Sequence, residues 1–474
     1  MSINYINIIL SILYGITSLY SPIGESYTLI LPSHIDVQDQ GSFKVRIKDD
    51  SISENETLSI NFEDSFTLSD KHGKDDIYGT IDNPSLVFDI DNANEKTVNY
   101  HINNISSGEW SGNLNLTITY NKKAEGNVLI DGSSINSILS SLNPSTISFS
   151  HDNIAGDYLY DISLAQDESI LMYQDGSDIT ITNKINEPIK ANEDMSNIFS
   201  MLNITAINNL NYLDMSSCVD MSRMFLRCEK LKTLDVSSFV TSNVTNMSHA
   251  FDSMHACTNI TGLENFDVSN VEDLSYLLND NRALTSVPNL TGWNISNKCK
   301  DLSYMMCCIA YTAGSNGKSK WPTSEVNYTN WDVSGVKNMS HLFMNAFMLT
   351  KINLSGWNTS NVVDMSSMFE MTDSNDRSRL QVVTGLDGFD VTNVTNMERM
   401  FYNCLSLATA DFSTWEPISV NSLNNCFYET RKLNLNVFEN WDNYFDVNEV
   451  DITDCFGGYA GYMASGSYKP SWYN

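Results

Sequence analysis

The chain has 474 residues, which exceeds the roughly 100 to 200 residues of a usual compact core, so several domains or one extended array are expected. Its 58 acidic residues outnumber its 27 basic ones, and the net charge is -31. Such a surface repels phosphate backbones, which argues against nucleic acid as a partner.

The first 24 residues carry no charge, and residues 6–19 are apolar enough to resemble the hydrophobic region of a secretory signal. A signal normally begins with Lys or Arg, and this segment has neither. We therefore expect residues 1–26 to be either an N-terminal arm that docks on a partner or an atypical signal segment. No second apolar run approaches the ~20 residues that span a bilayer, so the chain is not expected to be transmembrane.

Residues 27–122 alternate apolar and polar side chains in short bursts, and clusters of Asn, Asp, Gly and Ser separate the bursts. Alternation with period two predicts an antiparallel β-sandwich that serves as a spacer or docking domain. The expected strands are 27–31, 43–47, 58–62, 86–90, 98–102 and 114–120.

Residues 123–200 have a different pattern, which mixes strands with a helix. A strand is expected at 128–132, and an amphipathic helix follows at 134–142 with Ser134 as its N-cap. Further strands are expected near Ile147, at 171–173 and at 178–182. A stack of repeats must cover its first open end, so we assign residues 123–200 as an α+β cap.

Residues 221–456 contain an internal repeat, which segments 357–369 and 389–401 show most clearly. Each repeat ends in a box of the form Met-Ser-x-Met-Phe. The first box residue recurs at Met221, Met247, Leu274, Leu302, Met339, Met365, Met397 and Leu423. Aromatic anchors keep the same phase, usually eight residues earlier, at Phe239, Phe266, Trp293, Trp331, Trp357, Phe389, Trp415 and Trp441. A period in the twenties predicts a solenoid over residues 201–441.

The fixed repeat positions are expected to be structural. The box predicts one helical turn with its apolar side chains inward, Phe401 among them, N-capped by the Asp or Asn that precedes it. A second column predicts a ladder of amides that satisfy backbone groups, with a gap at Gly335. Its members are Asn243, Asn270, Asn297, Asn361 and Asn393. Residues 442–474, rich in aromatic residues, predict a C-terminal cap, and a stacking platform for sugar rings is the second interpretation.

All nine cysteines lie in the repeat region, several at fixed positions such as Cys228 and Cys404. A recurring small thiol predicts buried free cysteines rather than disulfides. The neighbours Cys307 and Cys308 have no His or second Cys pair at ligand spacing, so neither a metal nor another cofactor is predicted.

Two repeats break the period directly after the box. Residues 307–330 add about eleven residues and residues 370–388 about six, and insertions at one repeat position lie on one edge of a solenoid. Binding loops are often placed there, although tolerated drift is the alternative. The candidate binding residues are Tyr311, Lys318, Lys320, Trp321, Tyr328, Arg377 and Arg379. Basic residues on so acidic a protein favour an anionic glycan or an acidic surface.

Residues 239–248 (FVTSNVTNMS) and 389–397 (FDVTNVTNM) resemble the repeats of BspA-type leucine-rich-repeat surface proteins. The stretches 161–169 and 189–194 are similar to the cap that this family places before its first coil, and residues 27–122 resemble immunoglobulin-like spacers. The resemblance covers about residues 157–456. It implies extracellular display and adhesion, without catalytic residues, on bacterial surfaces or in phage-encoded proteins.

The expected architecture is a multidomain chain, with an N-terminal all-β sandwich followed by an α+β-capped leucine-rich-repeat solenoid. The sequence has no His-Glu-x-x-His, phosphate-binding glycine loop or nucleophile elbow, and His249 and His341 share a variable, exposed box position. We therefore expect a non-enzymatic recognition or adhesion protein that binds a protein or glycan on a cell surface.

The first interpretation of its location is a phage virion structural or appendage protein. Its N-terminal arm would bind other virion proteins, and its solenoid would face the host surface. The alternatives are a secreted bacterial cell-surface adhesin and a purely architectural decoration of a particle.

Overall fold

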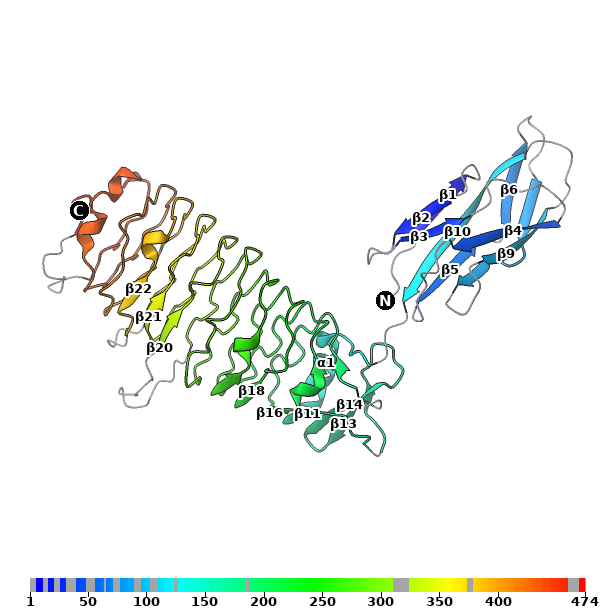
Figure 1. Ribbon diagram of the computed structural model, residues 1–474, viewed down its shortest axis with the longest axis horizontal. Helices are drawn as coiled ribbons and strands as arrows, with labels where there is room; N and C mark the ends of the chain where they lie inside the picture. The colour runs from blue at the N-terminus through cyan, green and yellow to red at the C-terminus, as the bar shows by residue number, and fades with distance from the viewer. Residues whose placement is uncertain are drawn as a thin grey trace. The chain divides into compact units, whose positions relative to one another are not determined.

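The chain divides into two compact units, Met1–Glu125 and Gly126–Asn474 (Figure 1). The computed structural model describes residues 6–11, 16–20, 26–30, 40–47, 56–63, 65–70, 77–88, 95–102, 110–122, 127–154, 156–183, 187–309, 324–372, 378–458 and 469–473. The boundary between the units lies close to the predicted start of the cap at residue 123. The predicted cap, solenoid and C-terminal cap all fall in the second unit.

The described part of the first unit is a network of ten antiparallel strands. They are β1 (Ile6–Ser11), β2 (Ile16–Tyr20), β3 (Ser26–Ile30), β4 (Gln40–Ile47), β5 (Glu56–Phe62), β6 (Ser65–Asp70), β7 (Ile77–Ile81), β8 (Ser85–Phe88), β9 (Glu95–Ile102) and β10 (Trp110–Lys122). Neighbours follow the order β2-β3-β4-β9-β7-β6-β10-β5-β8, and β1 also pairs with β10. Strand β10 pairs with β6 through residues 110–112 and with β5 through residues 116–122, so it joins two groups of strands.

The N-terminal segment contributes to this sheet. Strand β1 pairs with β10, with Ile6 opposite Ile118, and β2 pairs with β3, with Ile16 opposite Ile30. Residues 6–11 and 16–20 therefore pair with strands of the first unit. The expectation that residues 1–26 are a docking arm or an atypical signal segment stays a prediction. Strands β6 and β7 were also not expected, whereas the six predicted strands overlap β3, β4, β5, β8, β9 and β10.

The second unit begins with a helix and a small sheet that cover the first coil (Figure 1). Helix α1 (Gly132–Leu142) lies beside a five-stranded sheet of order β12-β13-β14-β11-β16. Its strands are β11 (Thr146–Ser150), β12 (Tyr160–Asp161), β13 (Ile170–Asp175), β14 (Asp178–Asn183) and β16 (Ala206–Asn208). A Cβ on Gly132 would lie 2.5 Å from the carbonyl oxygen of Ser196, so the helix start packs directly on the first coil.

The N-cap of α1 differs from the prediction. Asp131 caps the helix, because its Oδ1 accepts a hydrogen bond of 2.9 Å from the backbone N–H of Ser134. The helix thus starts two residues before Ser134. Its apolar face is as predicted, since Ile135 and Leu139 are fully buried.

The rest of the unit is a stack of coils joined by parallel pairing, which we call the coil stack (Figure 1). Its strands are β15 (Ile189–Lys190), β17 (Leu213–Asp214), β18 (Thr233–Asp235), β19 (Asn259–Thr261), β20 (Ser324–Asn327), β21 (Leu349–Asn353) and β22 (Val382–Thr384). Short 3₁₀ helices are η1 (Leu210–Tyr212), η2 (Leu263–Asn265), η3 (Leu386–Gly388), η4 (Leu435–Phe438) and η5 (Trp441–Asn443). Parallel bridges connect the residue before each box, in the sequence Asp194, Asp220, Asn246, Asp273, Asp301, Asn338, Asp364, Asn396, Ser422 and Asp451.

The box is not a helical turn, contrary to the prediction. In a helix its N–H groups would donate to carbonyls within the same segment. Here every second N–H donates to the next coil; Met221 donates to Asn246 O at 3.0 Å and Arg223 to Ser248 O at 2.9 Å. The third residue of the box and the second residue after the box take a left-handed conformation. The φ angle is 55° at both Arg223 and Arg227.

The side chains of the box still point inward at the predicted positions. Met221, Met224, Phe225 and Cys228 are fully buried. The Phe rings of successive boxes stack, with centroids 5.6 Å apart for Phe225 and Phe251. The core is therefore a set of continuous columns, one side chain per coil in each column.

The Asp or Asn before each box caps the backbone as an Asx turn. Its side-chain oxygen accepts a hydrogen bond from the N–H two residues later, at 3.0 Å from Ser248 to Asn246 and 2.8 Å from Ser366 to Asp364. The predicted capping oxygen is present, although the turn that follows is not helical.

The amide column and the aromatic anchors connect neighbouring coils. The Nδ2 atoms of Asn243, Asn361 and Asn393 each donate, at 2.7 Å, to a carbonyl of the preceding coil. The column is interrupted at Gly335, where a Cβ would lie 1.9 Å from the carbonyl oxygen of Asn297. Only glycine fits this close approach.

The anchor rings are buried and stack along the coils. Trp357 donates through Nε1 to the carbonyl of Tyr328 at 2.9 Å, and Trp331 donates to the carbonyl of Leu290 at 3.3 Å. Phe389 stacks on Trp357 with centroids 6.2 Å apart. Four anchors and one box ring named as structural are at most 4% exposed: Phe239, Trp331, Trp357, Phe389 and Phe401.

All nine cysteines are free, and eight of them are buried. Burial raises the pKa of Cys218 to about 12 and that of Cys257 to about 11, so these thiols stay protonated. The exception is Cys308, which is half-exposed.

The last coil is covered by aromatic side chains. Trp472 donates through Nε1 to the carbonyl of Phe438 at 2.8 Å, and Tyr473 packs edge-on against Phe456 at 5.2 Å. These contacts give the described C-terminal residues the role of a cap.

Replacing Asp364 tests the Asx turn. Asp364→Ala is expected to lower the free energy of unfolding by about 1 kcal/mol, because the Ser366 N–H loses its acceptor. Asp364→Asn is the matched control, since Asn246, Asn338 and Asn396 fill the same position. Urea unfolding of both variants measures the difference, and equal losses would contradict the assigned role.

Candidate functional site

A row of four aromatic rings runs along the coil stack on the side formed by the boxes. It consists of His249, Tyr276, Tyr304 and His341, and we call it the ring ladder. Successive ring centroids are 4.3, 4.4 and 4.0 Å apart, and the planes are within 10° of parallel. Each ring comes from a different coil, so the ladder connects four coils that are distant in sequence.

The backbone dictates where these rings point. Each occupies the third box position and is left-handed, with φ of 56° at His249, Tyr276 and Tyr304 and 60° at His341. This conformation turns the side chain away from the core that its neighbours fill, and all four residues are half-exposed. Because the rings cover each other's faces, their contact with solvent is limited largely to their edges.

The pKa of the Tyr304 phenol is raised to about 12 by burial, and burial also raises that of Tyr276. Both phenols therefore stay protonated at neutral pH and retain a hydrogen-bond donor on the ladder.

At one end of the ladder lies a buried carboxylate. Asp252 is 5% exposed, and its Oδ2 lies 2.7 Å from Nδ1 of His249. Its Oδ1 accepts hydrogen bonds from Asn279 Nδ2 at 2.9 Å and Ser253 Oγ at 2.7 Å. These contacts hold the ring of His249, whose side chain is 26% exposed.

A second acid–imidazole pair lies beside the first. His255 Nε2 is 3.0 Å from Asp280 Oδ2, and Arg282 donates to both oxygens of Asp280 at 2.6 and 2.8 Å. The side chains of His255, Asp280 and Arg282 are 34%, 18% and 52% exposed, so the group offers donors and acceptors at the surface. Such a mixture suits a ligand with many hydroxyl or carboxylate groups.

At the other end the ladder stops because Ser367 occupies the third box position. Arg399, one coil further, donates through Nε to Glu370 Oε1 at 2.9 Å and lies 3.7 Å from the centroid of Tyr402. Tyr402 stacks on Tyr428 at 4.9 Å. Glu370 is only 3% exposed, so Arg399 supplies the partner that a buried carboxylate requires.

Asn345 connects the bases of the two insertions. Its Nδ2 donates to Cys308 Sγ at 3.6 Å, and its Oδ1 accepts from the N–H and Oγ1 of Thr372 at 2.8 and 3.0 Å. Cys308 lies near the start of the first insertion, residues 307–330, and Thr372 near the start of the second, residues 370–388. The two insertions thus leave the coil stack next to each other, on the coils that flank His341.

Of the seven binding residues predicted from the sequence, the structure describes two, Tyr328 and Arg379. Tyr311, Lys318, Lys320, Trp321 and Arg377 lie outside the described residues, and Arg379 is half-buried.

The prediction for Tyr328 is wrong. Its side chain is fully buried, its ring stacks on Trp331 at 4.1 Å, and its hydroxyl faces Met306 Sδ at 3.6 Å. The inserted stretch rejoins the coil at β20, which begins at Ser324, so Tyr328 belongs to the core.

Sequence analysis missed the ring ladder as a unit. The available signal was the third box position, which carries His, Tyr, Tyr and His in four consecutive repeats. Stacking depends on the distance between coils in space, and this distance cannot be read from the spacing of residues along the chain.

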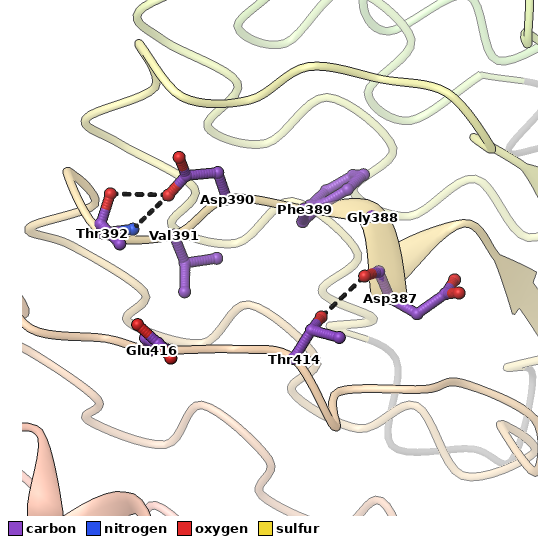
Figure 2. A pocket seen from close by; sticks show the side chains of 8 residues that line it. All are labelled: Asp387, Gly388, Phe389, Asp390, Val391, Thr392, Thr414 and Glu416. Atoms are coloured by element: carbon purple, nitrogen blue, oxygen red, sulfur yellow. Dashed lines mark hydrogen bonds between the residues drawn. The ribbon is translucent and has the colours of Figure 1, made fainter.

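A surface depression lies elsewhere on the coil stack, between the coils at 387–392 and 414–416 (Figure 2). Its polar groups are occupied by local structure; Asp390 accepts from Thr392, and Thr414 Oγ1 donates to the carbonyl of Asp387 at 2.7 Å. Figure 2 shows the carboxylates of Asp387, Asp390 and Glu416 pointing in different directions. They do not converge on a common ligand position.

A family described as "Mycoplasma protein of unknown function, DUF285" matches residues 193–321 and 315–441. Together the matches span 193–441, which is 249 of the 474 residues. The chain belongs to this family. The two matches overlap at residues 315–321, inside the first insertion, so the family pattern covers the coils on both sides of it.

No curated protein and no solved structure matches the chain. In the described residues no helix combines the length and the apolar character that crossing a membrane requires. The described residues also contain no group of three or more His, Cys, Asp or Glu side chains arranged to hold a metal ion.

Replacing Asn345 tests the connection between the insertion bases. Asn345→Ala is expected to cost about 1–3 kcal/mol of stability, because it removes the amide and puts alanine at a φ of 55°. Asn345→Gly removes the same amide without backbone strain, so its cost is expected to be smaller by about 1 kcal/mol. Both variants should speed hydrogen exchange at the Thr372 N–H; unchanged exchange would contradict the contact.

His341 gives the protein a pH dependence. Burial lowers the pKa of its imidazolium, while Glu370 and Asp364 raise it and Arg399 lowers it further. The unfolded state, with a pKa of about 6.5, takes up the proton first as the pH falls. The stability that His341 contributes is therefore fully present above a pH of about 6.5. It is lost as the pH falls from there towards the pKa of His341 in the folded state.

The test is His341→Tyr, which keeps a ring in a position where Tyr276 and Tyr304 adopt the same backbone conformation. The urea midpoint of the wild type is expected to fall more than that of the variant between about pH 8 and pH 5. Parallel curves for the two proteins would show that His341 does not titrate in this way.

Proposed function

We propose that this chain is a non-enzymatic recognition or adhesion protein, and that the box side of its coil stack binds a protein or glycan on a cell surface. The observation that carries the proposal is the common location of the ring ladder and the two insertion bases. Asn345 joins those bases directly beside His341. Binding surfaces of repeat proteins form where variable positions of successive repeats lie side by side.

The chemistry of the ladder favours a hydroxyl-rich ligand. Its ring faces are covered, so the hydroxyls of Tyr276 and Tyr304 and the outer edge of His249 are the groups that contact a partner. Asp280 and Arg282 add an acceptor and a planar donor beside them. A glycan offers matching pairs of donors and acceptors. The basic residues of the insertions favour an anionic one on this acidic protein.

The scaffold is proposed to be a leucine-rich-repeat solenoid of the BspA type, preceded by an immunoglobulin-like domain. Parallel bridges at each repeat and one core side chain per coil support this proposal. A purely architectural role is less favoured, because a packing column would not need half-exposed polar rings.

The proposed location is an outer surface, either of a bacterium or of a phage particle. The family description names Mycoplasma, and this favours the bacterial surface over the phage particle. In the phage alternative the first unit would hold the virion, and in the bacterial one it would be a spacer.

The double variant Tyr276→Phe, Tyr304→Phe tests the proposal, because it keeps the stack and removes both hydroxyls. Binding to an array of neutral, sialylated and sulfated glycans and to intact epithelial cells is expected to weaken about tenfold, as two hydrogen bonds are lost. The thermal midpoint is expected to change little. The matched control is Tyr78→Phe, Tyr158→Phe, at tyrosines that are 63% and 39% exposed elsewhere. Equal binding by both double variants would rule out the ladder as the contact surface.

A further inference from the structure

Cys307 and Cys308 hold two thiols in direct contact. Their Sγ atoms are 3.4 Å apart. A disulfide would need about 2.0 Å, and two ligands of a tetrahedral zinc with bonds of about 2.3 Å would be about 3.8 Å apart. Both cysteines are free, and closing the bond requires the sulfurs to approach and the backbone between them to adjust, because adjacent Cα atoms about 3.8 Å apart are closer than those of an ordinary disulfide. We propose that Cys307 and Cys308 are a redox modification site, which a low-molecular-weight disulfide converts into a disulfide between adjacent residues.

The two thiols differ in a way that sets the order of reaction. Cys308 is half-exposed, whereas the other eight cysteines are buried, so an external reagent meets Cys308 first. Its sulfur accepts hydrogen bonds from Cys307 Sγ and from Asn345 Nδ2 at 3.6 Å, and both stabilise a thiolate. The first of these contacts is the main reason that the pKa of Cys308 is lowered.

Cys307 has the features of the second, resolving thiol. It is only 3% exposed, so a dissolved disulfide does not reach it easily, but it already touches the sulfur that it must attack. Its hydrogen bond to Cys308 and its burial raise the pKa of the Cys307 thiol, so it keeps its proton and is the slower nucleophile. Reaction is thus expected to start at Cys308 and to finish at Cys307.

The steps balance with a small disulfide as oxidant. The Cys308 thiolate attacks one sulfur of the reagent, its S–S bond breaks, and one small thiolate leaves. Cys307 then loses its proton and attacks Cys308 Sγ, the mixed disulfide breaks, and the second small thiolate leaves. The protein loses two protons and two electrons, and the reagent takes them up to become two thiols.

The modification would act at the start of the first insertion. Cys308 has a φ of 54°, and it contacts Asn345, which also binds Thr372. Ring closure between adjacent residues constrains this backbone and draws the sulfur from the Asn345 amide. This proposal is argued from the two thiols and does not depend on the proposed recognition function. Either proposal can fail in its experiment without affecting the other.

The experiment treats the folded full chain with oxidised glutathione, blocks remaining thiols with N-ethylmaleimide and measures the peptides by mass spectrometry. In the wild type, the peptide with Cys307 and Cys308 is expected to be two hydrogens lighter and unblocked. The other seven of the nine cysteines are expected to react only after unfolding. A native protein that does not react, or that keeps one glutathione on Cys308 without closing the ring, would overturn the proposal.

Two variants check the order of the steps. Cys307→Ala is expected to stop at a stable mixed disulfide with one glutathione on Cys308, and Cys307→Ser provides a second version if the first folds poorly. Cys308→Ser is expected to abolish the reaction of the folded protein. Reaction of Cys308→Ser at the wild-type rate would show that Cys308 is not the attacking thiol. A matched control is Cys228→Ser, at a fully buried thiol, which should leave the reaction unchanged.

Discussion

The structure of the coil stack depends on one backbone constraint: alternate N–H groups of each box donate to the carbonyls of the next coil. The chain satisfies this constraint by placing the third box residue and the second residue after the box in the left-handed region. This conformation costs of order 1 kcal/mol or more for each non-glycine residue. Continuous columns of Met, Phe and Cys in the core offset that cost. Because each of these positions recurs from coil to coil, the side chains at one position align in a row along the stack, and the ring ladder is such a row.

The repeat phase was sufficient to predict which residues pair between coils and which are buried, but it misled about the box. Met221, Met224, Phe225 and Cys228 have the spacing i, i+3, i+4 and i+7 of an amphipathic helix. The same spacing arises here from a backbone with a left-handed residue at every fourth position. Arg223 and Arg227 occupy those positions, and nothing in an arginine side chain signals a positive φ.

The site was partly predictable for related reasons. Interrupted periodicity located two insertions directly after the box, at residues 307–330 and 370–388. Their mutual contact through Asn345 depends on the separation of coils in space, which sequence distance does not encode. Tyr328 was assigned to the insertion because counting from one box to the next does not show where an inserted stretch rejoins its coil. The strand β20 makes that junction at Ser324.

The ring ladder has a consequence for how this surface changes during evolution. Each rung is supplied by one coil, and a coil is one repeat of the gene. Duplicating or deleting a repeat would lengthen or shorten the row by one ring without altering the neighbouring contacts. Exchanging one codon at a third box position would change a single rung, as Ser367 does where the row ends. Length and chemistry of the surface can therefore vary independently, while the backbone that presents it stays constant.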